Sequence, residues 1–275
     1  MKNLLVEPAD QYHAKKEYIG SSSLKKAAIS MAHFHAAWTG AEIEKTDAMD
    51  NGTLLHELFL EQNIEKYCAR PLKDDGSLVA SNTAIYKEFL AANPGKTPIH
   101  PNLFNNMYAA LTAFANNKTA MRLLKDAIVE NSAYAVDHES GLLIKARPDI
   151  LGPDYIVDLK TTGKVLDNHF ERGIFSNQYD LQLAHYAETV YATTGQKITH
   201  FYVLAVEQKF PFASKIYRVN PRDVQEQKNV RRQYLNEIAV CKAENNFPGY
   251  RDEIIDAIKP SFLEQNNEIS FEGIG

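Results

Sequence analysis

Residues 142–161, LLIKARPDILGPDYIVDLKT, contain the pattern that decides the fold of this chain. Two apolar runs rich in β-forming residues flank the turn-forming triplet Gly152-Pro153-Asp154, and this arrangement predicts a hairpin or a sharply bent pair of strands. Because side chains alternate along a strand, Asp158 and Lys160 are expected on the same face. Asp149 follows a proline near the end of the first run, where a sheet edge or a bend is favoured. The three polar side chains are therefore expected to converge.

The residue types at this turn suit phosphate chemistry. Hard cations such as Mg²⁺ take oxygen ligands, usually one or two carboxylates together with water and substrate phosphate. A lysine close to such ligands can position or deprotonate an attacking water and offset charge in the transition state. The alternative is a solvated hairpin with an incidental ion pair, the commoner explanation of an isolated Asp-x-Lys triplet. The Pro148-Asp149 pair reduces the weight of that alternative and favours a metal-dependent phosphodiesterase centre.

Two predicted helices carry further polar side chains. Residues 52–60 have apolar side chains at core spacing, with His56 among them. Residues 178–194 contain no proline or glycine and are followed by a glycine, which predicts a helix with a C-terminal glycine stop. Gln182 and Tyr186 stand one turn apart on that helix. Taken alone, such a histidine is usually a core residue, and such a glutamine–tyrosine pair is usually half-buried helix surface.

Together these features resemble a known family. The motifs, in chain order, are Gly52-x-x-x-His56, Glu130, Pro148-Asp149, Asp158-x-Lys160 and Gln182-x-x-x-Tyr186. This set resembles the PD-(D/E)xK nuclease superfamily in its RecB-like branch, and the chain is most similar to the RecE-type, exonuclease VIII-like exonucleases of prophages and more distantly to lambda exonuclease. The segments ENSAYAVDHESGLLIKARPDIL and NQYDLQLAHYAE carry most of the match, which extends over residues 18–260.

The resemblance implies a metal site. His56, Asp149 and Asp158 would be the metal ligands, and Mg²⁺ would be the cofactor, with Mn²⁺ as a substitute. Family members often carry glutamate before the x-Lys pair, whereas this chain has the shorter Asp158, which must bring a metal closer to the strand. RecE-type proteins themselves contain this aspartate.

The resemblance also implies catalytic roles. Lys160 would be the catalytic lysine, acting with Asp149 and Asp158. Glu130 would be an accessory acid near the attacking water or a second metal. Gln182 and Tyr186 would orient the scissile strand or support the site.

The activity that the resemblance implies is Mg²⁺-dependent 5′ to 3′ exonucleolytic digestion of linear double-stranded DNA. The products would be 5′-mononucleotides and 3′ single-stranded overhangs for a RecT-like annealing partner in DNA recombination and repair. A homo-oligomeric ring, a tetramer or a trimer, would keep the enzyme on its DNA. Two alternatives stay open, namely a structure-specific or restriction-type endonuclease with the same centre and a non-catalytic DNA-binding subunit.

Length and composition favour one cytoplasmic α/β domain. The 275 residues, 44% of them hydrophobic, suffice for a substantial core. We expect a PD-(D/E)xK nuclease fold, a central mixed β-sheet flanked by helices, in a single nuclease domain over residues 1–275 with a loose tail after Pro260. There is no apolar run of about 18 residues and no signal peptide, so no membrane association is expected. Cys68 and Cys241 lie far apart outside any CxxC motif, which fits a reducing compartment and disfavours the cysteine cluster of Cas4-like nucleases.

The net charge of −5 is unusual for a DNA-binding protein, but only the DNA channel needs to be positive. Three basic pairs could line such a channel or could be solvated surface. They are Lys15-Lys16, Lys25-Lys26 and Arg231-Arg232.

Three consecutive serines, residues 21–23, predict N-caps that open a helix over 24–34. Because helix N-termini bind phosphates, we expect a DNA 5′-phosphate pocket there, and an ordinary capped helix is the alternative. Its residues would be Lys16, Ser22, Ser23 and Lys25.

Other elements follow from local patterns. Helices are expected over 81–92 and 103–125, and strands over 198–206 and 215–219. A long helix is expected from Asn220-Pro221 to residue 244, because asparagine caps helices and proline suits the first helical position.

Overall fold

The computed structural model describes residues 3–40, 54, 56–60, 64–166, 168–254 and 256–258. Its helices are α1 (Ala9–Ala14), α2 (Ser21–Ala27), α3 (Met31–Thr39), the 3-10 helix η1 (Ile64–Lys66), α5 (Ala84–Ala92), α6 (Pro101–Ala115), α7 (Lys118–Lys125), α8 (Asn168–Ser176), α9 (Tyr179–Thr194) and α10 (Pro221–Glu244). Its strands are β1 (Tyr67–Ala69), β2 (Thr97–Ile99), β3 (Ile128–Val129), β4 (Ala133–Val136), β5 (Leu143–Ala146), β6 (Ile150–Leu151), β7 (Tyr155–Thr162), β8 (His200–Glu207) and β9 (Ser214–Val219). Residues 54 and 56–60 are also helical.

The centre of the fold is a mixed five-stranded sheet in the order β3-β6-β7-β8-β9. β7 and β8 are parallel, and the other neighbouring pairs are antiparallel. Parallel neighbours need a long crossover, which here contains α8 and α9. The predicted α/β architecture with a central mixed sheet is confirmed.

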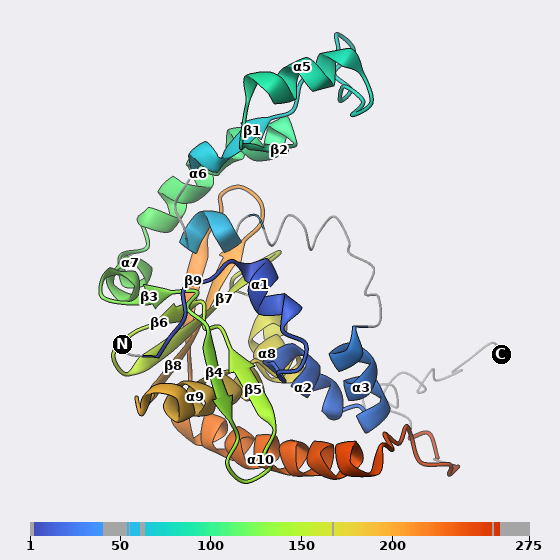
Figure 1. Ribbon diagram of the computed structural model, residues 1–275. Helices are drawn as coiled ribbons and strands as arrows, with labels where there is room; N and C mark the ends of the chain where they lie inside the picture. Colours follow the sequence, from blue (N-terminus) through green and yellow to red (C-terminus); the bar gives the residue numbers. More distant parts are fainter. Residues whose placement is uncertain are drawn as a thin grey trace, which may run out of the picture.

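Helices cover both faces of the sheet (Figure 1). Ile156 and Val203 pack with Leu183 and other buried side chains of α9 on one face. Val157 and Leu159 pack on the other face with buried side chains of α6 and of the helical residues 56–60. The two faces of β7 therefore contribute to different cores, as alternation along a strand requires. A third cluster joins α2 and α3 to α9, α10 and β5.

The predicted run over 142–151 is divided into two strands. β5 pairs with β4 in a separate two-stranded sheet, whereas β6 joins the central sheet and pairs with β7. Pro148 lies between them, where a residue without an N–H cannot continue a ladder. The hairpin predicted around Gly152-Pro153-Asp154 is confirmed as the antiparallel pair β6–β7, whereas the single strand expected before it is divided by a bend directly before Asp149.

Two predicted helices are interrupted. The helix expected over 24–34 begins earlier, because Gly20 is the N-cap of α2 and the three serines lie in its first turn. It ends at Ala27, and Ser30 then caps the separate helix α3. The helix expected over 103–125 is broken at residues 116–117, where Asn117 accepts a hydrogen bond from the backbone N–H of Ala120 and caps α7. In both places a side chain that binds a free backbone N–H starts a new helix.

Other predicted boundaries agree with the structure. Gly195 adopts a left-handed conformation (φ 76°) after α9, and Asn220 caps α10 with a proline at its first position. The helix expected over 81–92 is α5, which begins at Ala84 because Thr83 caps it. The loose tail after Pro260 lies outside the described residues, as does Gly52. None of the described helices is long and apolar enough to cross a membrane.

Segment 64–115 forms an arm. β1, β2 and α5 project from the body, and α6 leads back toward the sheet (Figure 1). The short parallel pair β1–β2 joins Tyr67 to Thr97 at the base of α5. The arm contributes Phe114 and Met107 of α6 to the core under the sheet.

Candidate active site

Asp158 and Lys160 face the same side of β7, as the alternation predicts. The Asp158 side chain has no solvent exposure, and its Oδ2 lies 2.8 Å from Lys160 Nζ. The approach is not aligned for a hydrogen bond, and Oδ2 accepts none from the described residues. A buried carboxylate oxygen without a hydrogen bond is costly, so its stability depends on nearby positive charge.

Asp149 is held against the same strand. Its Oδ2 accepts a hydrogen bond from the backbone N–H of Leu159 at 2.6 Å. Leu159 lies between Asp158 and Lys160 in the chain, so this bond fixes the bend relative to β7. The first acid, the second acid and the lysine are therefore held together by backbone structure as well as by charge.

His56 and Glu130 approach Asp149 from other segments of the chain. His56 Nε2 lies 3.1 Å from Asp149 Oδ2, and His56 Nδ1 lies 3.6 Å from Glu130 Oε1. Glu130 has a left-handed backbone (φ 53°), and its N–H donates to the carbonyl oxygen of Asp149. Arg147 Nη2 donates to Glu130 Oε2 at 3.3 Å. The structure thus brings the predicted histidine and accessory acid to Asp149.

α9 delivers Gln182 and Tyr186. Gln182 Nε2 donates to Asp158 Oδ1 at 2.7 Å and to the Tyr186 hydroxyl at 2.8 Å. Gln182 Oε1 accepts a hydrogen bond from Lys25 Nζ at 2.7 Å. All seven residues predicted for the metal and catalytic roles therefore lie in one connected group of contacts.

Charge is balanced within this group. Burial raises the pKa of the Asp158 carboxyl, and the Lys160 ammonium offsets only part of that rise. Burial acts in the same direction on Asp149, but the charges of His56 and Lys160 outweigh it and lower the pKa of that carboxyl. Burial lowers the pKa of Lys160 and of His56, yet the carboxylates overcome it and raise both. Lys160 is thus held as a cation beside two carboxyl groups.

The donor set suits a hard divalent cation. Asp149, Asp158 and Glu130 offer carboxylate oxygens, and His56 offers a ring nitrogen. Within the part of the chain that the structure describes, no group of three His, Cys, Asp or Glu side chains is arranged to hold a metal ion. These side chains are paired with each other and with Lys160. The residues fit a metal on the chemistry of the donor set and on the buried Oδ2 of Asp158, which lacks a hydrogen bond.

The residues predicted for a 5′-phosphate pocket do not all come together. Lys16, Ser22 and Ser23 line one cavity of about 220 Å³, which Lys26 also lines. Lys25 points elsewhere, because its Nζ donates to Gln182. The structure therefore separates the Lys25 ammonium from the other three residues predicted for this pocket.

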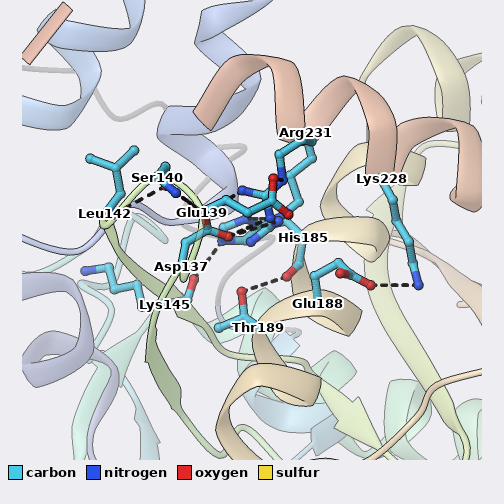
Figure 2. A network of polar contacts seen from close by, with 11 residues as sticks. Asp137, Glu139, Ser140, Leu142, Lys145, His185, Glu188, Thr189, Lys228 and Arg231 are labelled. Carbon is cyan, nitrogen blue, oxygen red and sulfur yellow. Dashed lines mark hydrogen bonds and ion pairs between the residues drawn. The ribbon is translucent and has the colours of Figure 1, made fainter. Parts of the chain in front are cut away.

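A second polar network, which the sequence did not indicate, lies beside α9 (Figure 2). Arg231 is 2% exposed, so the prediction that Arg231 could belong to a basic surface was wrong. Its Nε donates to His185 Nδ1 at 3.3 Å, and its Nη1 lies 3.7 Å from Asp137 Oδ1. His185 Nε2 then donates to the carbonyl oxygen of Lys145 at 3.0 Å. The network joins α10, α9 and the β4–β5 hairpin.

The sequence assigned no site role to Tyr179 or Arg147, and it assigned Lys25 to the phosphate pocket and not to the group around Gln182. Tyr179 lies one turn before Gln182, and Arg147 directly precedes the Pro-Asp pair, so helical spacing and proximity to the motif were the available signals.

Comparison with known proteins identifies the family. The description "PDDEXK-like domain of unknown function (DUF3799)" matches residues 20–260. The chain belongs to this family. The membership agrees with the central sheet and with the positions of Asp149, Asp158 and Lys160, and it confirms the resemblance to PD-(D/E)xK nucleases. No curated protein matches the sequence.

Solved structures resemble this PDDEXK-like protein to different degrees. One is a protein from Eubacterium rectale described as a putative exonuclease, with a TM-score of 0.61, 18% identity and coverage of 96% of this chain and 100% of that chain. Another is the alkaline exonuclease LHK-Exo from Laribacter hongkongensis, with a TM-score of 0.33, 11% identity and coverage of 86% of this chain and 98% of that chain. At 18% identity, the first likeness establishes the fold alone. Family and fold together support a nuclease.

Proposed function

We propose that this protein is a Mg²⁺-dependent exodeoxyribonuclease that digests linear double-stranded DNA from 5′ to 3′. The observation that carries the proposal is the group formed by Asp149, Asp158 and Lys160, with His56 on one side and Gln182 on the other. Solvated ion pairs do not require a fully buried aspartate at the centre of a sheet. A charged, desolvated cluster is more typical of a functional site.

Each residue has a role in phosphodiester hydrolysis. Asp149, Asp158 and His56 would hold the metal, with Glu130 nearby, and a bound Mg²⁺ would supply charge for the substrate phosphate and the attacking water. Lys160, held as a cation by the aspartates, would orient the water and offset charge that develops on the phosphate. Gln182 holds Asp158 in place, and Tyr186 holds Gln182. Groups held in place by such contacts can stabilise developing charge without having to reorganise.

The exonuclease activity and its 5′ to 3′ polarity are both inferred from similarity. The RecE-type resemblance implies 5′ to 3′ polarity, and the Eubacterium rectale protein of the same fold is described as a putative exonuclease. We further propose that the enzyme acts in the cytoplasm as a homo-oligomeric ring, a tetramer or trimer, around its DNA. Its product would be 3′ single strands for a RecT-like annealing partner. The net charge of −5 supports enclosure, because an acidic protein gains little from non-specific attraction to DNA.

A digestion assay tests the proposal. Linear duplex DNA labelled at one 5′ end or one 3′ end is incubated with the protein, with and without Mg²⁺, and covalently closed circular DNA is a parallel substrate. We expect Mg²⁺-dependent release of the 5′ label as mononucleotide before the 3′ label, and an intact circle. The matched control is Asp158→Asn, which should be inactive and folded. Cleavage of the circle would instead support an endonuclease, and no cleavage of either DNA would contradict the proposal.

A further inference from the structure

The Gln182 amide has three partners that together allow only one orientation. Its Nε2 faces Asp158 Oδ1 at 2.7 Å and the Tyr186 hydroxyl at 2.8 Å, while its Oε1 faces Lys25 Nζ at 2.7 Å. An ionised carboxylate can only accept hydrogen bonds, and an ammonium can only donate them. If the amide were flipped, its oxygen would face a carboxylate and its NH₂ group would face an ammonium. Lys25 and Asp158 therefore select the same orientation.

Lys25 reaches Gln182 from a helix that is itself anchored. Leu24 and Ala27 of α2 are buried in a cluster that also contains Leu181 of α9. The Lys25 ammonium lies 4.8 Å from the centre of the Tyr179 ring, which helps to hold a cation there. Docking of α2 on α9 thus places the ammonium beside Gln182, and the contact does not depend on a free surface side chain.

The two lysines of the site act on different oxygen atoms of Asp158. Lys160 also lies 4.8 Å from the centre of the Tyr179 ring, but its ammonium is paired with Asp158 Oδ2. Lys25 acts on the other oxygen of Asp158 through Gln182. One carboxylate oxygen is therefore bound to α9, and the other faces Lys160.

We propose that Lys25 is a positioning residue of this centre: it fixes the Gln182 amide so that Asp158 Oδ1 stays bound to α9 and Oδ2 is presented to the reacting centre. The consequence for metal binding rests on the proposed function, because Oδ2 would then be the oxygen of Asp158 that is left for the cation. Groups that orient metal ligands typically change metal affinity or activity by about 10- to 100-fold when they are removed. Through Lys25, helix α2 would then influence catalysis as well as the binding of a DNA end.

The test uses a small set of variants. Lys25→Met keeps much of the length but cannot donate a hydrogen bond, and Lys25→Arg can donate to the single acceptor Oε1. Gln182→Met and the double variant complete a cycle that measures whether the two residues act together. Lys197→Met, at an exposed lysine next to β8, is the matched control.

The first readout is Mg²⁺ affinity of the DNA-free protein, measured by titration calorimetry. We expect Lys25→Met to bind Mg²⁺ about 10- to 100-fold more weakly and Lys25→Arg to recover most of the loss. In the Gln182→Met background, Lys25→Met should have no further effect. Wild-type affinity in Lys25→Met would overturn the proposal. Independent losses that multiply in the double variant would also overturn it, because Lys25 would then act directly on the centre.

The second readout needs neither metal nor DNA. In protein with ¹⁵N-labelled glutamine, the Gln182 side-chain amide is assigned by its absence in Gln182→Met, and its hydrogen exchange is measured by NMR. We expect slow exchange in the wild type and in Lys197→Met, and clearly faster exchange in Lys25→Met. Equal protection in wild type and Lys25→Met would overturn the positioning role. If the protein proved inactive on DNA, or did not bind Mg²⁺, the proposed function would fail while this exchange measurement would still decide the role of Lys25.

Discussion

Asp149 Oδ2 accepts a hydrogen bond at 2.6 Å from the backbone N–H of Leu159, the residue between Asp158 and Lys160. One carboxylate therefore serves two purposes, since it also pairs with His56 at 3.1 Å. The bond ties the bend after Pro148 to the middle of β7. The same atom, Asp149 Oδ2, therefore holds the backbone of β7 and contacts His56 in the candidate active site.

Substitutions of Asp149 should separate these two purposes. Asp149→Ala leaves the buried N–H of Leu159 without an acceptor, which should lower the free energy of unfolding by about 1–3 kcal/mol. Asp149→Asn retains an oxygen acceptor and should lose less stability, whereas both variants should lose DNA cleavage because they lack the ligand charge. Urea unfolding and the digestion assay measure the two effects. Substantial cleavage by Asp149→Asn would remove Asp149 from the metal site.

Lys160 should be intolerant of arginine. Lys160→Arg keeps a positive charge but replaces a compact ammonium by a planar guanidinium that fits the 2.8 Å contact with Asp158 differently. We expect cleavage to fall by about 10²- to 10³-fold, with DNA binding retained. Single-turnover rates and filter binding test this, with Lys160→Ala as comparison. An arginine variant with full activity would leave charge stabilisation as the only role of Lys160.

His56 should contribute to metal binding as well as to packing. His56→Ala removes the partner of Asp149, so Mg²⁺ affinity should fall at least about tenfold. Calorimetric titration and the melting temperature are measured on the same preparation. Neighbouring Leu58 is fully buried and makes no such ion pair, so Leu58→Ala should lower the melting temperature while Mg²⁺ affinity is kept. If His56→Ala behaved as Leu58→Ala does, the histidine would be a core residue only.

The cavity lined by Lys16, Ser22 and Ser23 should recognise a 5′-phosphate. A terminal phosphate carries more negative charge than a hydroxyl, so DNA with 5′-phosphates should be digested faster than DNA with 5′-hydroxyl ends. Lys16→Ala should reduce this rate ratio more than it reduces binding to internal duplex, which follows general phosphate neutralisation. Lys118→Ala, at another cavity, should leave the ratio unchanged. Equal digestion rates for DNA with 5′-phosphate ends and DNA with 5′-hydroxyl ends would show that this cavity does not recognise a 5′-phosphate.

The buried His185 should weaken the fold in mild acid. Burial, followed by the charge of Arg231, lowers the pKa of His185 to about 3, so the folded state keeps this ring neutral down to that pH. The unfolded chain takes up the proton near pH 6.5, so stability falls as the pH drops from about 6.5 toward 3.

The change from pH 7 to pH 5 corresponds to about 2 kcal/mol for this group. His185→Gln cannot titrate, so its loss of stability between pH 7 and pH 5 should be smaller than that of the wild type by this amount. Urea unfolding at the two pH values measures the difference. An equal loss in both proteins would show that His185 is protonated in the fold.

Local patterns in the sequence determined much of the framework. Alternation along β7 placed Asp158 and Lys160 on one face, and Pro148 marked the bend before Asp149. Gly195 and Asn220 fixed the end of α9 and the start of α10. These features depend on backbone conformation and on hydrogen bonds within a few residues, and such preferences are present in the local sequence.

Only the tertiary structure decided which side chains meet. Lys25 and Lys26 are equivalent as a charged pair in the sequence, yet packing of α2 on α9 directs Lys25 to Gln182 and leaves Lys26 at the cavity. Arg231 likewise resembles a surface residue until α10 packs over His185. The contacts of both residues join segments far apart in the chain. Their partners are set by how whole helices pack against the sheet, and no local preference encodes that arrangement.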